Sequence, residues 1–392
     1  MAFHAFLEPA QIGMPLVLLA LQVFLAWKTA SPTRRSSAAR TALSPSSLAR
    51  SRTRRKIDVM DKLAGNKGTG TRTVVITGGK TGLGFACAKA ILESPRGAPW
   101  QVVLACRDEG RAQAAVDQLS GGAGNSWQVT ALSLDLASLA SVRAFAAELT
   151  RRLSTGSTAP LHAAVCNAGV NPLGTRTTTA DGFESTFGVN HLGHFLLINE
   201  LLPTLKPPGR VVVVASGVHD PAQKSGVPAP AWNAPAALAQ GELGPAGASD
   251  KTWAGGQRRY STSKLANVYF TYALARHAPP GVTANAFDPG LMPGTALMRE
   301  APAALRFILG HIPIALLRRV FSPNVHTAQE SGEALARLVT DPDLSETTGR
   351  YFEGDHEIRS SDESYDDERA DELWKASVSL TAAPPRSPEA PS

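Results

Sequence analysis

The chain has 392 residues, of which 43% are hydrophobic and 34 are glycine, so it can form one large α/β domain with extensions or two small domains. Its net charge of +6 arises locally, because nine of the 39 Lys and Arg residues lie between Lys28 and Lys56, where no acidic residue occurs. The other 30 basic residues are outnumbered by 33 acidic ones, which argues against a nucleic-acid partner. The cysteines Cys87, Cys106 and Cys166 lack CxxC spacing, so buried thiols are expected rather than disulfides or a zinc site.

Residues 1–57 read as a leader in two parts. Residues 12–27 are uncharged and mostly apolar, which is short for a membrane-spanning helix but suits a signal-type segment. Residues 31–55 are rich in Ser, Arg and Ala and contain no acid, as transit peptides do. The leader therefore predicts a plastid presequence. The alternative is an uncleaved anchor in the endoplasmic reticulum membrane, whose basic residues bind anionic lipid.

From residue 73 onward, continuous apolar runs alternate with helical stretches. Such runs are typical of parallel strands covered on both faces, so we expect a doubly wound α/β fold in one domain over residues 70–378. Strands are predicted at residues 73–77, 101–106, 127–134, 161–166, 210–215 and 282–287, and helices at residues 83–93, 112–119, 138–153 (N-cap Ser138), 182–205 and 260–277.

Three segments depart from this alternation. Residues 217–256 are rich in Pro, Ala and Gly and too long for an ordinary connection, so we interpret them as a functional insertion or lid. Residues 301–320 are markedly apolar and could be a packing helix, a pocket lid or a membrane-touching helix. Residues 379–392 are expected to form a disordered tail.

A glycine loop follows the first predicted strand. Glycines between a first strand and a first helix allow a pyrophosphate to approach the helix N-terminus, where free N–H groups favour an anion. The candidate cofactor-binding residues here are Gly78, Lys80, Gly82, Leu83 and Gly84.

The ends of the second and third predicted strands carry charged residues. Arg107 suits the 2′-phosphate of NADP, where NAD enzymes place an acid, and Lys80 adds positive charge. Asp108 could instead cap the following helix. Asp135, followed by Leu136, could meet the adenine edge or act as an N-cap.

Polar residues also follow later strands, where parallel sheets bind ligands. The fourth strand ends in Asn167-Ala168-Gly169 and the fifth is followed by Ser216. His191 and His194 share a face of the long helix, but no third ligand is evident, so we interpret both as structural and expect no metal.

Tyr260 and Lys264 are spaced by one helical turn, which places the phenol beside the ammonium. A lysine charge ~5 Å away, at an effective dielectric of ~20, would lower the tyrosine pKa by ~2 units. That shift would make Tyr260 a usable general acid and base.

These motifs, in this order from about residue 73 to 353, resemble the short-chain dehydrogenase/reductase family. The segments 105–108, 190–197 and 263–267 are most similar to its protochlorophyllide oxidoreductase and retinol dehydrogenase branch. The resemblance implies a Rossmann fold and a catalytic set of Asn190, Ser216, Tyr260 and Lys264. It further implies contacts of Asn167, Ala168, Gly169, Pro289, Gly290 and Thr295, and of Tyr260 and Lys264 themselves, with the cofactor.

The resemblance also implies a role for each catalytic residue. Asn190 would hold a water that feeds the proton relay, and Ser216 would bind the substrate oxygen. Tyr260 would transfer the proton. Lys264 would lower the tyrosine pKa and bind the nicotinamide ribose.

Two positions depart from protochlorophyllide oxidoreductases, which carry cysteines where this chain has Ala266 and Leu291. We therefore expect an NADPH-dependent oxidoreductase that acts on a carbonyl or alcohol of an apolar substrate. The alternatives are double-bond reduction in a tetrapyrrole and a non-catalytic NADPH-binding protein. Membrane association through the leader or residues 301–320 is a further expectation.

Overall fold

The computed structural model describes residues 70–94, 99–121, 128–171, 176–223, 225–244, 252–293, 314–320, 322 and 324–382. Apart from Gly70, these residues belong to one compact unit of the chain. The leader, residues 245–251 of the insertion, Thr295 and residues 301–313 lie outside the described residues.

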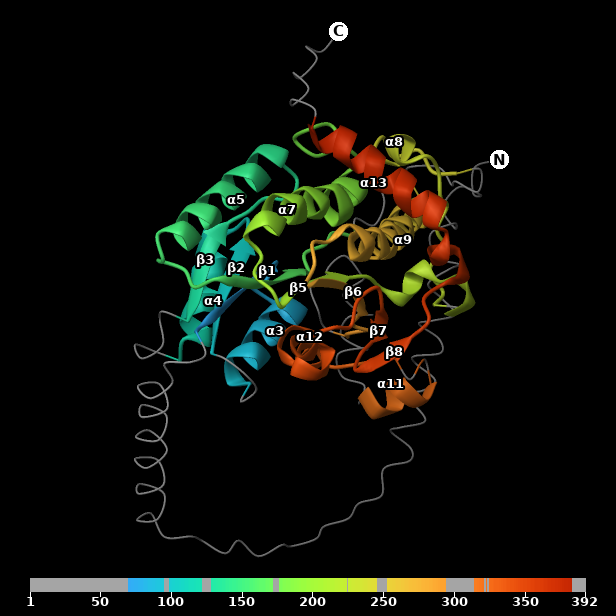
Figure 1. The fold of residues 1–392 in the computed structure, drawn as a ribbon. Coiled ribbons are helices and arrows are strands. Elements are labelled where there is room, and N and C mark those ends of the chain that lie inside the picture. The colour runs from blue at the N-terminus through green and yellow to red at the C-terminus, as the bar shows by residue number, and fades with distance from the viewer. Residues whose placement is uncertain are drawn as a thin grey trace, which may run out of the picture. The chain divides into compact units, whose positions relative to one another are not determined.

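Eight strands form one sheet in the order β3-β2-β1-β4-β5-β6-β7-β8, with every neighbouring pair parallel except β7 and β8 (Figure 1). The doubly wound parallel sheet expected from the apolar runs is thus confirmed. The strands are β1 (Arg72–Thr77), β2 (Trp100–Cys106), β3 (Val129–Ser133), β4 (Leu161–Cys166), β5 (Gly209–Val214), β6 (Val282–Asp288), β7 (Tyr351–Glu353) and β8 (His356–Ile358).

Helices cover both faces of the sheet, which is why its central strands are largely buried and mostly apolar. Figure 1 shows one layer on each side. The first layer contains α3 (Gly82–Glu93), α4 (Glu109–Leu119) and α12 (Ala328–Thr340). The second contains α5 (Leu139–Ser154), α7 (Gly193–Leu201), α9 (Trp253–His277) and α13 (Asp367–Ala382). Because α13 runs through Ala382, residues 379–382 are helical.

The strand order reverses between β1 and β4. The chain builds β1, β2 and β3 on one side and then crosses to add β4, β5 and β6 on the other. At such a reversal the loops after the two strands diverge, which opens a crevice at the carboxyl ends of the strands. The glycine loop after β1 and the polar residues after β4 therefore meet at one edge of the sheet.

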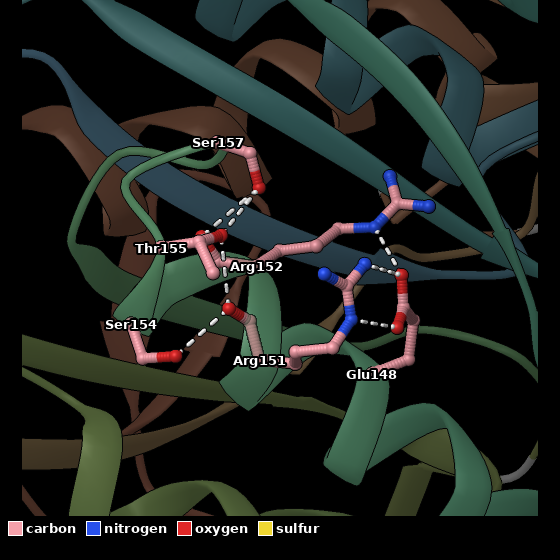
Figure 2. Close-up of polar contacts among 6 residues, drawn as sticks. All are labelled: Glu148, Arg151, Arg152, Ser154, Thr155 and Ser157. Carbon is pink, nitrogen blue, oxygen red and sulfur yellow. Dashed lines mark hydrogen bonds and ion pairs between the residues drawn. The ribbon is translucent and has the colours of Figure 1, made fainter.

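Helix α5 shows how a local sequence fixes an element's ends. Ser138 is its N-cap, as predicted, and accepts a hydrogen bond from the Ser141 amide. At the other end, Figure 2 shows Glu148 bonded to Arg151 and Arg152, at 2.7–2.8 Å. The carbonyls of the last turn accept hydroxyl hydrogen bonds from Ser154, Thr155 and Ser157. These contacts are exposed and stabilise the helix end.

The predicted long helix at 182–205 is broken in the structure. It consists of α6 (Ser185–Phe187), a π-helix η1 (Gly188–Leu192), α7 and a 3-10 turn η2 (Leu202–Thr204). The amide of Gly193 bonds the carbonyl of Gly188, five residues back, instead of four. A π turn of this kind is common at functional sites, and this one contains Asn190.

The insertion at 217–256 also differs from the expectation. Its last residues, from Trp253, form the first turns of α9, seven residues earlier than predicted. The remainder holds two 3-10 turns, η3 (Gly217–His219) and η4 (Pro221–Gln223), and the short helix α8 (Pro235–Leu238). It packs along α9, where the amide of Ala231 donates to Thr262 and the hydroxyl of Ser261 donates to the carbonyl of Pro228.

The apolar segment at 301–320 is described only from α11 (Ile314–Val320), where Leu317 is buried. Within the described ranges, no helix is both long enough and apolar enough to cross a membrane.

Candidate active site

Tyr260 and Lys264 lie on α9, both buried, facing the end of β5. The Lys264 Nζ lies 5.6 Å from the centre of the Tyr260 ring, so the expected one-turn pairing is present. Lys264 also donates to the carbonyl of Val214, the last residue of β5, over 2.9 Å. Asn267 donates to the same carbonyl at 3.1 Å. Two side chains of α9 thereby fix the helix to the sheet next to the crevice.

Ser216 follows β5 and faces Tyr260. A hydrogen bond between the Ser216 hydroxyl and the phenol lowers the Tyr260 pKa, although burial outweighs it. The backbone of Ser216 is held by His219, whose Nδ1 lies 2.7 Å from the Ser216 carbonyl. The Nε2 of His219 accepts from the amide of Ser361 at 3.1 Å, so Nδ1 carries the proton. His219 was not expected as a site residue, yet it connects Ser216 to the C-terminal segment.

Asn190 lies in the π turn, fully buried. Its Oδ1 accepts from the amide of Val170 at 2.8 Å, and its Nδ2 donates to the Val170 carbonyl and to the Ser263 hydroxyl, both at 3.0 Å. Ser263 in turn donates to the carbonyl of Tyr260 at 2.7 Å. The end of β4, the π turn and the catalytic helix are therefore joined through one asparagine side chain.

The electrostatics of Tyr260 differ from the sequence-based expectation. Burial raises the Tyr260 pKa, Asp288 raises it further, and the Ser216 hydrogen bond only partly opposes them. Burial lowers the pKa of Lys264 to about 8, with Asp288 acting in the opposite direction. The expected lowering of the tyrosine pKa by lysine is not found, because loss of solvent on burial is the largest influence on the phenol and disfavours its charged form.

A buried ion pair joins the catalytic helix α9 to the start of α6. Arg259 Nε lies 3.6 Å from Glu184 Oε1, and both side chains are almost fully buried. Glu184 also accepts from the amides of Thr186 and Phe187, which begin the broken helix. The pair thus links the residue before Tyr260 to the helix that carries Asn190.

The glycine loop has the shape of an anion cradle. Gly78 and Gly82 have φ of 67° and 58°, which other residues rarely adopt. A Cβ on Gly84 would lie 2.6 Å from Asn167 Nδ2 and 2.9 Å from the Gly78 carbonyl, so only glycine fits. No side chain caps α3, and its first turn holds no acid. The helix N-terminus therefore suits a phosphate, and the residues present fit a dinucleotide. Leu83 is buried in the core, so only its backbone can face that site.

Thr77, the last residue of β1, joins this loop to the motif after β4. Its Oγ1 accepts from the amides of Asn167 and Ala168, each at 2.9 Å, and Asn167 Nδ2 donates to the Thr77 carbonyl. A Cβ on Gly169 would approach Asn190 Oδ1 to 3.3 Å and Lys264 Nζ to 3.8 Å. The Asn167-Ala168-Gly169 segment thus lies between the glycine loop and the catalytic residues.

The charged residues near β2 and β3 are close to one another. The Arg107 side chain is 74% exposed and lies 3.9 Å from Asp135. Asp135 accepts from the amide of Ala137, and Leu136 packs against Gly193 of α7. Asp108 caps α4 through the Arg111 amide, as its alternative interpretation had it. Arg107 is therefore available to an anion at the crevice. Near it, the amides of Gly79 and Lys80 bond the Cys106 thiol, which places the glycine loop at the end of β2.

Pro289 and Gly290 follow β6. The Pro289 carbonyl accepts from Ser331, and Gly290, with φ of 69°, donates its amide to Asp288 at 2.9 Å. A Cβ on Gly290 would lie 2.1 Å from Asn324 Oδ1, which excludes any larger residue. Thr295, also expected to contact the cofactor, lies outside the described residues.

His191 and His194 point in different directions. The Nε2 of His191 lies 2.8 Å from the Ser377 hydroxyl of α13, among the rings of Phe187, Phe195 and Phe270. Burial lowers the pKa of His191 to about 3 and of His194 to about 4. In the part of the chain that the structure describes, no group of three candidate ligands could hold a metal ion.

A cavity of about 570 Å³ lies elsewhere, between α4, α5 and β3. Cys106, Ser133, Ser141 and Phe145 help to line it, and none of the four candidate catalytic residues does.

Together, a doubly wound sheet, a phosphate-binding glycine loop and a buried Ser-Tyr-Lys cluster define a nicotinamide-dependent oxidoreductase. A model of the short chain dehydrogenase family matches residues 72–228. Protochlorophyllide reductase B, chloroplastic, of Hordeum vulgare is 35% identical over 344 residues, covering 81% of this chain and 80% of its own. Retinol dehydrogenase 14 of Mus musculus is 36% identical over 324 residues, covering 78% and 84%.

A solved structure has a similar fold. A crystal structure of an uncharacterised protein from Mycobacterium paratuberculosis has a TM-score of 0.53 and 28% identity, covering 80% of this chain and 95% of its own. The chain therefore belongs to the short-chain dehydrogenase/reductase family, in the branch that contains protochlorophyllide reductases and retinol dehydrogenases, and it is an enzyme of that type.

Proposed function

We propose that the protein is an NADPH-dependent oxidoreductase that interconverts a carbonyl and an alcohol on an apolar substrate. The observation that carries the proposal is the convergence of Ser216, Tyr260 and Lys264 at the carboxyl end of β5, beside a loop shaped for a dinucleotide. When bound, the nicotinamide supplies or accepts the hydride.

Tyr260 is the proposed proton donor to the carbonyl oxygen. Its raised pKa keeps the phenol protonated at neutral pH, which is the form that reduction needs. Ser216, on the same oxygen, orients the carbonyl. Lys264 is the next proton source after Tyr260, since a pKa of about 8 lets it give up a proton near neutrality. Lys264 would also hold the nicotinamide ribose.

Asn190 provides the route by which the proton is replaced. Its side chain is fully engaged with Val170 and Ser263, so the backbone carbonyl is the group left for water. That carbonyl is bonded to His194 Nδ1 at 3.1 Å, and its second lone pair can accept a hydrogen bond from a water molecule.

NADP is proposed over NAD because of charge at the end of β2. The exposed guanidinium of Arg107 is placed to meet a 2′-phosphate, and Lys80 adds a second cation from the glycine loop. Asp135 competes for Arg107 at 3.9 Å, a distance too long for a strong ion pair at an exposed position.

An apolar substrate is favoured by exposed hydrophobic residues that neighbour the catalytic elements. Val170 follows Gly169, Leu291 follows Gly290, and Trp253 lies in the first turn of α9. Large exposed apolar side chains beside polar catalytic groups are typical of a site that binds an apolar ligand.

Double-bond reduction in a tetrapyrrole is the second candidate, supported by the 35% identity to protochlorophyllide reductases. The positions that carry cysteine in those enzymes weaken it, because Ala266 is fully buried and Leu291 offers no proton. The leader is proposed as a plastid presequence, with an endoplasmic reticulum anchor as the alternative.

The test is NADPH oxidation against retinoid, steroid and quinone carbonyls and against protochlorophyllide in light and in darkness. Turnover of a carbonyl, lost in Tyr260→Phe, supports the proposal. Light-dependent reduction of the pigment, with no activity on any carbonyl, would establish the second candidate instead.

A further inference from the structure

Asp288, the last residue of β6, is a carboxylate buried to 1% exposure at the edge of the crevice. Its Oδ1 accepts from the amide of Gly290 at 2.9 Å, and its Oδ2 accepts from Nδ2 of Asn324 at 3.1 Å. Both donors are neutral, and within the described ranges no cation forms an ion pair with it. Burying an ionised carboxylate without a cation beside it costs free energy, so a nearby group that its charge stabilises is expected.

The strand register shows what that charge faces. Phe287 packs into the core beneath α3 and α12, whereas Ala286 packs with Val268 and Tyr272 of α9. Because side chains alternate along a strand, Asp288 points to the α9 side. Phe287 pairs with Val214, whose carbonyl holds the Lys264 ammonium. The carboxylate therefore lies one strand from the anchored ammonium, on the same face of the sheet.

The position is also tightly constrained. A Cβ on Gly217, the residue after Ser216, would lie 2.9 Å from Asp288 Oδ2, so the carboxylate is packed against the Ser216 loop. Asn324, its second donor, is itself held by His326 at 3.1 Å. These contacts keep the carboxylate in one orientation beside the catalytic cluster.

We propose that Asp288 is a positioning residue for proton transfer, whose buried negative charge holds Lys264 as the ammonium and Tyr260 as the neutral phenol near neutral pH. The electrostatics of both groups agree with this role. Burial has the largest effect on each pKa, and Asp288 has the next largest: it raises the pKa of Tyr260 and opposes the lowering of the pKa of Lys264. The proposal rests on the proposed function only for the roles of those two residues.

Other titratable groups face Asp288 and share its field. Each of these groups can affect the pH dependence of activity, so the test must follow the titration of Lys264 directly. These groups are Tyr260 and Lys264 on α9, His219 in η3, His326 before α12, and Tyr351 and Glu353 on β7.

The experiment compares wild type with Asp288→Asn by NMR titration of ¹⁵N-labelled lysine side chains, using Lys264→Ala to assign the resonance. Removing the charge lowers the midpoint of Lys264 by about one pH unit, which is the order of magnitude expected for one nearby buried charge of opposite sign. The high-pH limb of carbonyl reduction moves down by the same amount. Asp181→Asn, which removes another buried carboxylate, one that binds the amide of Leu139, leaves the Lys264 midpoint unchanged.

A second variant guards against a folding defect. Asp288→Asn combined with Asn324→Asp keeps a carboxylate–amide pair but moves the charge to the neighbouring residue, and the Lys264 midpoint then falls by less than in the single variant. A wild-type midpoint in both variants overturns the proposal. If no carbonyl is turned over, the proposed function fails, and the NMR titration still decides the effect of Asp288.

Discussion

His194 donates its Nδ1 proton to the backbone carbonyl of Asn190, 3.1 Å away, while its Nε2 lies 2.9 Å from the hydroxyl of Thr77. The imidazole is buried and uncharged, so Nε2 accepts from Thr77. One ring thereby connects the strand that leads into the glycine loop with the π turn. Nothing in the spacing of the two histidines indicated this link.

We predict that His194→Leu lowers kcat about tenfold and destabilises the fold by ~1–3 kcal/mol, because Thr77 and Asn190 each lose a buried partner. His194→Gln, which can both donate and accept, should recover part of the loss. The measurement is steady-state kinetics with urea unfolding of both variants. Equal kcat in wild type and His194→Leu would show that the link does not affect catalysis.

Tyr260→Phe is expected to reduce kcat by ~10²–10⁴-fold, the usual contribution of a positioned acid, with little change in NADPH affinity. Lys264→Ala should lower both kcat and the affinity for NADPH. Tyr269→Phe is a matched control on the same helix, since the Tyr269 hydroxyl donates to the carbonyl of Glu363, away from the candidate catalytic residues. Stopped-flow turnover and NADPH fluorescence titration make the comparison. A fully active Tyr260→Phe enzyme would remove Tyr260 from the mechanism.

Arg107→Ala should raise the KM for NADPH about tenfold and leave the KM for NADH nearly constant, because only NADPH carries the phosphate that the guanidinium would bind. Arg111→Ala is the control, as Arg111 is an exposed arginine four residues further along the chain, paired with Asp108. The measurement is the KM of each variant for NADPH and for NADH under the same conditions. A similar loss with NADH would contradict the assignment of Arg107 to the phosphate.

Gly84→Ala should destabilise the fold by ~1–3 kcal/mol and weaken NADPH binding, because the added methyl would collide with Asn167 and with the Gly78 carbonyl. Gly110→Ala provides a contrast. Its methyl meets only Asp108 Oδ1, at 3.8 Å, in the helix α4, so it should stabilise by ~0.5–1 kcal/mol. Thermal unfolding of both variants tests the pair, and two shifts of the same sign would refute the steric argument.

Buried neutral histidines predict sensitivity to acid. In His191 and His194 burial lowers the pKa from 6.5 to about 3 and about 4. The unfolded chain therefore binds protons first, so the stability that the two neutral imidazoles contribute is complete above pH ~6.5 and is lost as the pH falls through about 4 and about 3, by a few kcal/mol in total. His191→Phe, placed among three phenylalanine rings, should flatten this decline. Urea midpoints between pH 4 and 8 would show it, and an unchanged slope would argue against His191 as a cause.

The strands and the order of the motifs could be predicted because continuous apolar runs and a glycine cluster are local signals. The break at Gly188–Leu192 could not, because nothing in the residue types Gly-Val-Asn-His-Leu signals a five-residue turn. The early start of α9 was hidden by Gly255 and Gly256, which lower helix propensity but are buried in the helix. Strands β7 and β8 have three residues each, which is too short for an apolar run or an alternation of apolar and polar residues to be recognised.

Within the site, the sequence placed Tyr260 beside Lys264 but gave the wrong sign for the tyrosine pKa, because burial depends on the whole fold. The partners of His219 and Asp288 lie far along the chain, at Ser361 and Asn324, so no spacing rule could have found them. What could have raised interest in Asp288 is a charged residue at the end of an apolar strand, directly before Pro289.

The π turn should make this helix tolerant of a length change at one place. In Gly188–Leu192 the amide of Gly193 bonds the carbonyl of Gly188 five residues back, so deleting one residue of the turn would leave the same two groups paired as in an ordinary α-helix. The residues after the turn would keep their orientation, and Phe195, whose ring packs against Phe270 and Trp374, would stay in the core. A one-residue deletion in the regular helix that follows would instead rotate everything after it by about 100°. A deletion scan across this helix should therefore yield folded protein for single deletions only within the π turn.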